Sequence, residues 1–151
     1  MTDSEREFKL ADFPSFFKGN VDILLGQPSL FDVGINLKSK YSTMQIQSGL
    51  SEQEDIAVDT VFLGLYEDST AVLPYLEANR VMIGNTLGIP SASEILVMDT
   101  SIIALSQRQD RRVLVVLADS PEALNNAVDR LTSGEFLAGL VNDFVEVYKT
   151  E

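Results

Sequence analysis

The sequence has 151 residues and contains no cysteine, no histidine and no tryptophan. Without histidine, the chain cannot build an imidazole general base, a Ser-His-Asp triad or a histidine-ligated metal site. Without cysteine, it cannot form a disulfide, present a thiolate nucleophile, or hold an iron–sulfur cluster or a usual structural zinc ion. We therefore expect no cofactor, no metal site and no catalytic residue of these classes.

Basic residues are also scarce. Eleven lysines and arginines face 23 aspartates and glutamates, which gives a formal net charge of −12 and a sequence pI of about 4.3. Such a surface repels a phosphate backbone, so the charge predicts no nucleic-acid partner. The composition is otherwise that of a globular protein, with 45% hydrophobic and 23% charged residues.

Long hydrophobic runs are absent as well. The longest, residues 113–118 and 61–65, fall far short of the roughly 20 residues that cross a bilayer. Residues 1–10 are charged and contain no apolar stretch typical of a secretory signal. The sequence as written predicts a cytoplasmic protein that does not insert into a membrane. A fragment of an exported protein, periplasmic or extracellular, would look the same.

Three continuous apolar runs predict buried strands, because strands of this kind need cover on both faces of their sheet. A helical pattern follows each run, and this alternation is typical of βαβ units with right-handed crossovers. We predict a single α/β domain over residues 12–151, after a solvated lead-in at 1–11. Its expected architecture is a three-layer sandwich with a mostly parallel sheet, flavodoxin-like or related, and a mixed edge hairpin. The expected strands are 21–25, 60–65 and 113–118, and the expected helices are 29–40, 69–79 and 121–133.

Weaker patterns predict further elements. Alternation of polar and apolar residues over 43–47 and 143–149 predicts two more strands, and residues 136–141 predict a short helix. The acidic stretch 51–59 favours the solvated face of a short helix. A divalent-cation site is the alternative there, but the stretch lacks an Asp-x-Asp-x-Asp-Gly loop.

The region before the strongest strand predicts a loop and a hairpin. Glycine and proline in 84–93 are typical of a loop. The apolar runs 94–98 and 101–105 flank Asp99 and Thr100, which predicts a two-residue hairpin turn.

The best local signal starts the helix at 121–133. Ser120 fits the N-cap, Pro121 fits the first helical position, and Glu122 suits the positive end of the helix dipole. Ser133 and Gly134 then predict its end.

Acidic residues follow two of the predicted strands. Glu67 and Asp68 come after the strand at 60–65, next to Tyr66, and Asp119 comes after the strand at 113–118. Ligands of α/β sheets usually bind at such strand ends, so these four residues belong to a candidate ligand or partner surface. Carboxylates at these positions could perform general acid–base work. Helix capping is the simpler interpretation of both acidic sites.

Two other features bear on binding. No Gly-x-Gly-x-x-Gly or Gly-x-x-x-x-Gly-Lys-Ser/Thr motif is present, which argues against a nucleotide site. Arg108, Arg111 and Arg112 form the densest basic cluster, for which a solvated turn is a simpler interpretation than an anion site.

Three aromatic residues surround a proline near the N-terminus. Phe13, Phe16 and Phe17 complete the candidate ligand or partner surface. The first interpretation is a loop whose aromatic rings plug the edge of the domain. An exposed aromatic cluster that binds a ligand or partner is the alternative.

Three segments carry a family resemblance. Residues 10–17 read Leu-Ala-Asp-Phe-Pro-Ser-Phe-Phe, residues 59–64 predict a strand that ends in glycine, and residues 111–124 run from a strand through an acidic turn into a helix. In order and spacing, the chain resembles an α/β module of the periplasmic B-type regulatory subunit family of bacterial cellulose synthases. The family's carbohydrate-binding β-sandwich, signal peptide and membrane anchor have no counterpart in the sequence. The resemblance implies a non-catalytic scaffold around an exported polysaccharide.

Three functional hypotheses follow. The first is a non-catalytic interaction or scaffold domain for a protein partner or a polysaccharide, of the type that serves cellulose-type synthesis or export. The second is a small hydrolase or transferase that acts through Glu67, Asp68 and Asp119. The third is a cytoplasmic regulatory domain that dimerises through Phe13, Phe16 and Phe17. The sequence leaves the oligomeric state open.

Overall fold

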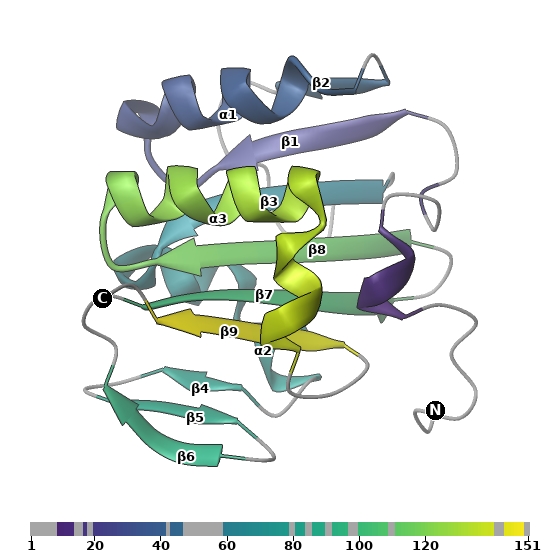
Figure 1. The fold of residues 1–151 in the computed structure, drawn as a ribbon. Helices are drawn as coiled ribbons and strands as arrows, with labels where there is room; N and C mark the ends of the chain where they lie inside the picture. The colour runs from purple at the N-terminus through teal and green to yellow at the C-terminus, as the bar shows by residue number, and fades with distance from the viewer. Residues whose placement is uncertain are drawn as a thin grey trace.

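The computed structural model describes residues 9–13, 17, 20–41, 43–46, 59–78, 81–83, 86–89, 92–96, 100–108, 111–140 and 144–149. Within this part of the chain, a six-stranded sheet forms the centre of the molecule (Figure 1). The strand order is β2-β1-β3-β8-β7-β9. Its strands are β1 (Val21–Leu25), β2 (Met44–Ile46), β3 (Asp59–Leu65), β7 (Thr100–Arg108), β8 (Arg111–Ala118) and β9 (Val145–Lys149).

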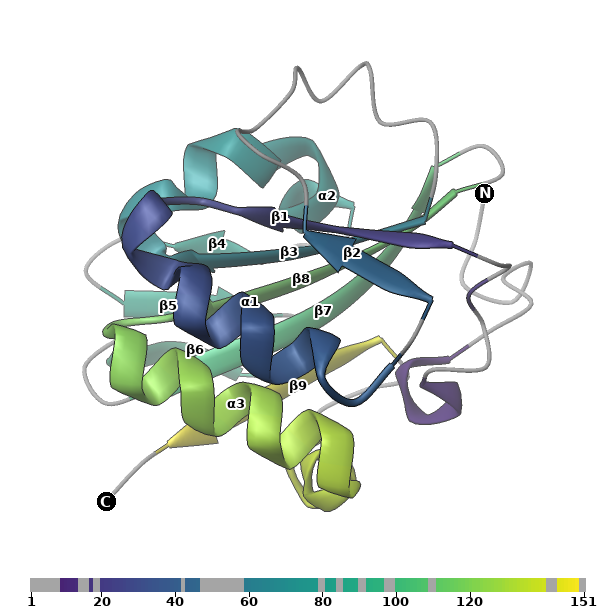
Figure 2. The ribbon, with the colours of Figure 1, turned by 90° about the horizontal axis from the view of Figure 1, so that it is seen from above.

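Helices cover both faces of this sheet. The helices α1 (Phe31–Lys38) and α3 (Pro121–Ser133) lie side by side on one face, and α2 (Leu73–Glu77) lies on the other (Figure 2). The predicted α/β fold is therefore confirmed. The sheet is mixed, because the pairs β2–β1, β1–β3 and β3–β8 are parallel whereas β8–β7 and β7–β9 are antiparallel.

Strand β8 shows why the continuous apolar runs fold as they do. Successive side chains of a strand point to opposite faces of the sheet. Leu114 and Val116 pack in the core beneath α1 and α3, whereas Val113 and Val115 pack in the core beneath α2. Every residue of β8 from 112 to 118 is buried, so the run is apolar on both sides because both sides face a core.

A second, smaller sheet corrects two predictions. Residues 84–93 contain all of β5 (Thr86–Ile89) and the start of β6 (Ala92–Leu96). Strand β5 pairs on one side with β6 and on the other with β4 (Met82–Ile83), in an antiparallel sheet. The expected hairpin across Asp99 and Thr100 is therefore wrong: β6 pairs with β5, whereas β7 pairs with β8 and β9. Gly88 lies inside β5, and a loop prediction from composition cannot recognise so short a strand.

Strands β7 and β8 form a hairpin further along the chain. Its register pairs Arg108 with Arg111 across β7 and β8. Strand β7 extends over nine residues, so it contains both the apolar run 101–105 and the polar residues that follow it.

Most of the other predicted elements are present with shifted ends. A 3₁₀ turn, Pro28–Leu30, leads into α1, and the 3₁₀ helix η5 (Tyr66–Val72) leads into α2. Pro74 therefore stands in the first turn of α2, where a helix tolerates proline. The final helix is the 3₁₀ helix η6 (Glu135–Gly139), and β9 follows it. Residues 51–58 of the expected acidic helix lie outside the described residues, whereas Asp59 begins β3 and is buried.

The expected lead-in, residues 1–11, contains a residue of the hydrophobic core. Leu10, in the 3₁₀ helix η2 (Leu10–Asp12), is fully buried and belongs to the core beneath α1 and α3, in contrast to the expected solvated lead-in.

In the part of the chain that the structure describes, no helix is long and apolar enough to span a membrane.

The ends of α3 confirm the capping prediction. The Ser120 hydroxyl accepts a hydrogen bond from the Ala123 N–H at 3.1 Å, and Pro121 is the first helical residue. Gly134 ends the helix in the left-handed region with φ 89°.

Gly134→Ala is expected to lower the free energy of unfolding by about 1 kcal/mol, because a Cβ disfavours the left-handed conformation. A Cβ there would meet no atom within 4 Å, so backbone strain is the sole source of the expected loss. Urea denaturation measures it. Gly134→Asn is the control, since asparagine tolerates this conformation, and an equal loss in both variants would contradict the explanation.

Candidate functional site

The carboxyl ends of β1 and β3 mark the place where a sheet of this topology usually binds its ligand. The helix after β1 and the helix after β3 lie on opposite faces, so the chain reverses its winding between these two strands. Ligands of open α/β sheets bind in the crevice beyond the strand ends at such a point. Gly26 follows β1 directly, and Gly64 stands near the end of β3.

The half-buried Asp68 side chain lies at these strand ends, against both glycines. Its carboxylate accepts a hydrogen bond from the Leu65 N–H at 2.9 Å and another from the Gln27 side-chain amide at 3.3 Å. A Cβ placed on Gly26 would lie 2.6 Å from Asp68 Oδ2, and one placed on Gly64 would lie 3.2 Å from Asp68 Cβ. Asp68 therefore caps η5 and packs against the glycines that line the crevice, which confirms the capping interpretation for this residue.

The other predicted residues of this edge lie around Asp68. Glu67 and Asp119 are exposed, and Tyr66 is half-buried. The Tyr66 hydroxyl is 2.8 Å from the Thr100 hydroxyl at the start of β7. Burial raises the pKa of Tyr66, with a smaller opposing effect from Thr100 and a further increase from Asp119 and Glu146. Tyr66 and Asp119 thus lie near each other, at the ends of the neighbouring strands β3 and β8.

The aromatic residues near the N-terminus pack inside their own chain. Phe13 makes edge-to-face contacts with Phe17, Tyr41 and Phe136, with ring centroids 6.1, 5.6 and 6.4 Å apart. Phe13 and Phe17 are partly buried against the core beneath α1 and α3. Phe16 lies outside the described residues. These contacts are those of a plug at the edge of the domain.

Arg112 is the residue of the predicted arginine cluster whose side chain the structure describes. Arg112 is 2% exposed, so the solvated turn expected for it is wrong. Its backbone N–H donates to Asp59 Oδ1 at 2.9 Å, and its guanidinium lies 3.9 Å from the same oxygen. Asp59 is the first residue of β3 and Arg112 is the second residue of the neighbouring strand β8. The pair neutralises two buried charges at this end of the sheet.

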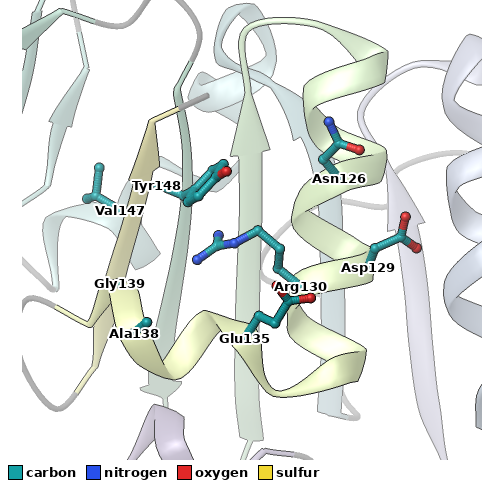
Figure 3. A pocket seen from close by; sticks show the side chains of 8 residues that line it. All are labelled: Asn126, Asp129, Arg130, Glu135, Ala138, Gly139, Val147 and Tyr148. Carbon is teal, nitrogen blue, oxygen red and sulfur yellow. The ribbon is translucent and has the colours of Figure 1, made fainter. Parts of the chain in front are cut away.

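A pocket of about 720 Å³ lies between α3, η6 and β9 (Figure 3). No prediction from the sequence pointed to it. Arg130 of α3 and Tyr148 of β9 reach toward each other across it, and Gly139 of η6 forms part of its wall (Figure 3). Its lining consists of Asn126, Asp129, Arg130, Glu135, Ala138, Gly139, Val147 and Tyr148.

Arg130, which lines this pocket, forms a buried ion pair with Glu146, which does not line it. Arg130 Nη2 lies 2.5 Å from Glu146 Oε2, with Arg130 11% exposed and Glu146 fully buried. The Arg130 guanidinium carbon also lies 3.7 Å from the centre of the Tyr148 ring, a cation–π arrangement. Arg130 is thus held between two side chains of β9.

Arg130 compensates the buried Glu146 carboxylate. Burial raises the pKa of Glu146, and the close contact with the Arg130 guanidinium opposes that shift. The contact is close, but neither carboxylate oxygen makes a well-aligned hydrogen bond with any described residue. Gly139 lies directly against it, since a Cβ there would be 2.7 Å from Glu146 Oε2. The pair therefore depends on one cation and on the absence of a side chain at residue 139.

Comparison with known proteins identifies no family for this chain. No family model matches the chain, and no curated protein matches it in sequence. Among the described residues, no group of three or more carboxylates is placed so that it could hold a metal ion. Fold and site define the chain as an α/β protein with a mixed sheet, a filled strand-end crevice and an open pocket beside α3.

Proposed function

We propose that this chain is a non-catalytic interaction or scaffold domain. The observation that carries the proposal is the position of Asp68 between Gly26 and Gly64. Its carboxylate takes up the space in which a sheet of this kind usually holds a substrate or nucleotide, and its hydrogen bonds serve to cap η5. A crevice filled by the chain's own side chain favours a role in binding through other surfaces.

The sequence resemblance supplies the ligand class of this proposal. We propose a cellulose-type polysaccharide, or a protein that assembles with it during synthesis or export. We also propose that the fold is related to flavodoxin-like sheets. In support, the parallel strands β1, β2, β3 and β8 have the spatial order second, first, third, fourth, as in that architecture.

A binding experiment tests the proposed function. The purified chain is applied to an array of β-linked glucans and to insoluble cellulose, and is used in parallel to capture proteins from a polysaccharide-producing cell. Phe31 of α1 is an exposed aromatic residue, 52% accessible, on which a sugar ring could stack. We expect glucan binding that Phe31→Ala weakens severalfold.

Ile35→Ala is the matched control, because Ile35 is exposed one turn further along the same helix. Absence of both a polysaccharide ligand and a specific protein partner would contradict the proposed function. A hydrolase activity that disappears in Asp119→Asn would contradict it equally.

A further inference from the structure

We propose that the pocket between α3, η6 and β9 binds an uncharged primary amide, whose carbonyl oxygen accepts a hydrogen bond from Arg130 Nη1. The inference rests on the proposed function, since it assigns the chemistry of one contact between an interaction domain and its partner. Asparagine and glutamine side chains of a partner protein carry this group, and so do small free amides. The pocket lining shares no residue with the crevice at the ends of β1 and β3.

A buried nitrogen of the pocket lining calls for an acceptor. Arg130 is 11% exposed, and its two terminal nitrogens have different surroundings. Nη2 lies against Glu146 Oε2, whereas Nη1 is buried and has no hydrogen-bond partner among the described residues. A buried donor without an acceptor is costly, because it has lost its hydrogen bonds to water. A ligand that brings an oxygen acceptor to Nη1 removes this cost.

Tyr148 controls the approach to this nitrogen. Its ring centre lies 3.7 Å from the Arg130 guanidinium carbon, and Figure 3 shows the two side chains reaching toward each other across the pocket. Tyr148 is half-buried and stands on β9, at one edge of the main sheet. An acceptor that enters from the pocket has to shift this ring to reach Nη1. Binding should therefore be visible at Tyr148 as well as at Arg130.

The charges of the lining favour an uncharged ligand. Glu146 balances the charge of Arg130. Asp129 and Glu135 line the pocket and are exposed, so both would repel an anionic ligand. A cationic ammonium group would offer no acceptor to Nη1. An uncharged group with an acceptor oxygen avoids both penalties.

A primary amide also offers donors to the rest of the lining. Carboxylates only accept hydrogen bonds, and Ser133 donates to one oxygen of Glu135, Oε1. An amide brings two N–H donors beside its carbonyl oxygen, whereas a hydroxyl group brings a single O–H. Ala138 and Val147 also line the pocket, and their apolar atoms suit an aliphatic stem. The lining thus matches an asparagine or glutamine side chain in polarity and in hydrogen bonding.

A titration of the isotope-labelled full chain, followed by nuclear magnetic resonance, tests the inference. The probes are propionamide, propionate, and capped Gly-Gln-Gly and Gly-Glu-Gly peptides. We expect the two amides to shift the backbone signals of Arg130, Gly139 and Tyr148 in a saturable manner. The carboxylates of the same shape should bind about tenfold more weakly, because two exposed carboxylates repel them. Preference for Gly-Gln-Gly over propionamide would identify a partner's side chain as the source, and the reverse would identify a small free amide.

Two variants locate the binding. Arg130→Lys keeps a cation for Glu146 but removes Nη1, so it should weaken amide binding about tenfold. Asp129→Asn removes an exposed charge and does not disturb the buried pair, so it should narrow the preference for propionamide over propionate about threefold. Glu67→Gln is the matched control, because it removes the same charge from an exposed residue at the strand-end edge. Circular dichroism confirms that each variant is folded.

Four results would overturn the inference. These are no saturable shift at Arg130 and Tyr148 with either amide, equal binding of propionate and propionamide, a preference that Glu67→Gln narrows as much as Asp129→Asn does, and a shift of the same signals by a soluble β-glucan but by neither amide. The proposed function is measured separately, through polysaccharide binding and partner capture. Capture without amide binding would reject the amide site alone.

Discussion

Arg130→Met is expected to lower the free energy of unfolding by about 3–5 kcal/mol near neutral pH. The substitution leaves Glu146, which is fully buried, without the cation that lies 2.5 Å away. Removing one partner of a buried ion pair is costly because the remaining charge has lost both water and its counter-ion. Urea denaturation followed by circular dichroism measures the change.

The loss is expected to depend on pH. Burial raises the pKa of Glu146 in the folded chain, and Arg130 opposes this shift, so the pKa in Arg130→Met rises further. A carboxyl with a raised folded pKa contributes most stability below its unfolded pKa, and that contribution is lost as pH rises through the folded value. The difference between wild type and Arg130→Met should therefore be small near about pH 4 and should grow toward about pH 8.

Two controls belong to this experiment. Lys38→Met removes an exposed cation from α1 and should change stability by less than about 0.5 kcal/mol. Glu146→Gln added to Arg130→Met should recover part of the loss, because the uncompensated charge is gone. A loss in Arg130→Met that is the same at acidic and neutral pH would contradict the explanation and would point to lost side-chain packing.

Gly26→Ala is expected to lower the free energy of unfolding by about 2–3 kcal/mol. A Cβ at this position would lie 2.6 Å from Asp68 Oδ2 and 2.8 Å from Asp68 Cβ, so the cap of η5 would have to move. Overpacking of this kind typically costs about 1–3 kcal/mol, and the strained cap adds to it. Urea denaturation of the variant measures the effect.

A double-mutant cycle shows whether Asp68 is the cause. Asp68→Gly removes the atoms that the new Cβ meets, so Gly26→Ala should be nearly neutral in that background, with a coupling of about 1–3 kcal/mol. Gly34→Ala is the matched control, because its Cβ would meet only the flexible ends of Ile46 and Leu25, at 3.1 and 3.2 Å. Additive effects of Gly26→Ala and Asp68→Gly would contradict the filled crevice.

The strands of the main sheet could be predicted from the sequence where the local pattern of apolar residues agrees with the packing of the folded chain. The runs at 21–25, 60–65 and 113–118 became β1, β3 and β8, since only strands covered on both faces are apolar at every position. Helix α3 was predictable to the residue because Ser120, Pro121 and Gly134 mark its ends by local chemistry. Strand pairing was not predictable: β6 and β7 are adjacent in the chain but belong to different sheets.

In the candidate site, too, some features could be predicted from the sequence and others could not. The cap formed by Asp68 could be predicted because it lies three residues from Leu65, whereas its contact with Gly26 depends on how β1 and β3 pair. The ion pair between Arg130 and Glu146 could not be predicted for a similar reason. Alternation in β9 suggests that Glu146 faces solvent, but α3 covers that face of the sheet and brings Arg130 to it.

The measurement that most directly tests the proposed function is a map of backbone amide chemical shifts during titration with a soluble β-glucan. The account predicts changes concentrated around Phe31 of α1, with the amides of Gly26, Gly64 and Asp68 unmoved. Changes centred on Gly26, Gly64 and Asp68 would contradict it, because they would show that the crevice between β1 and β3 is open to a ligand.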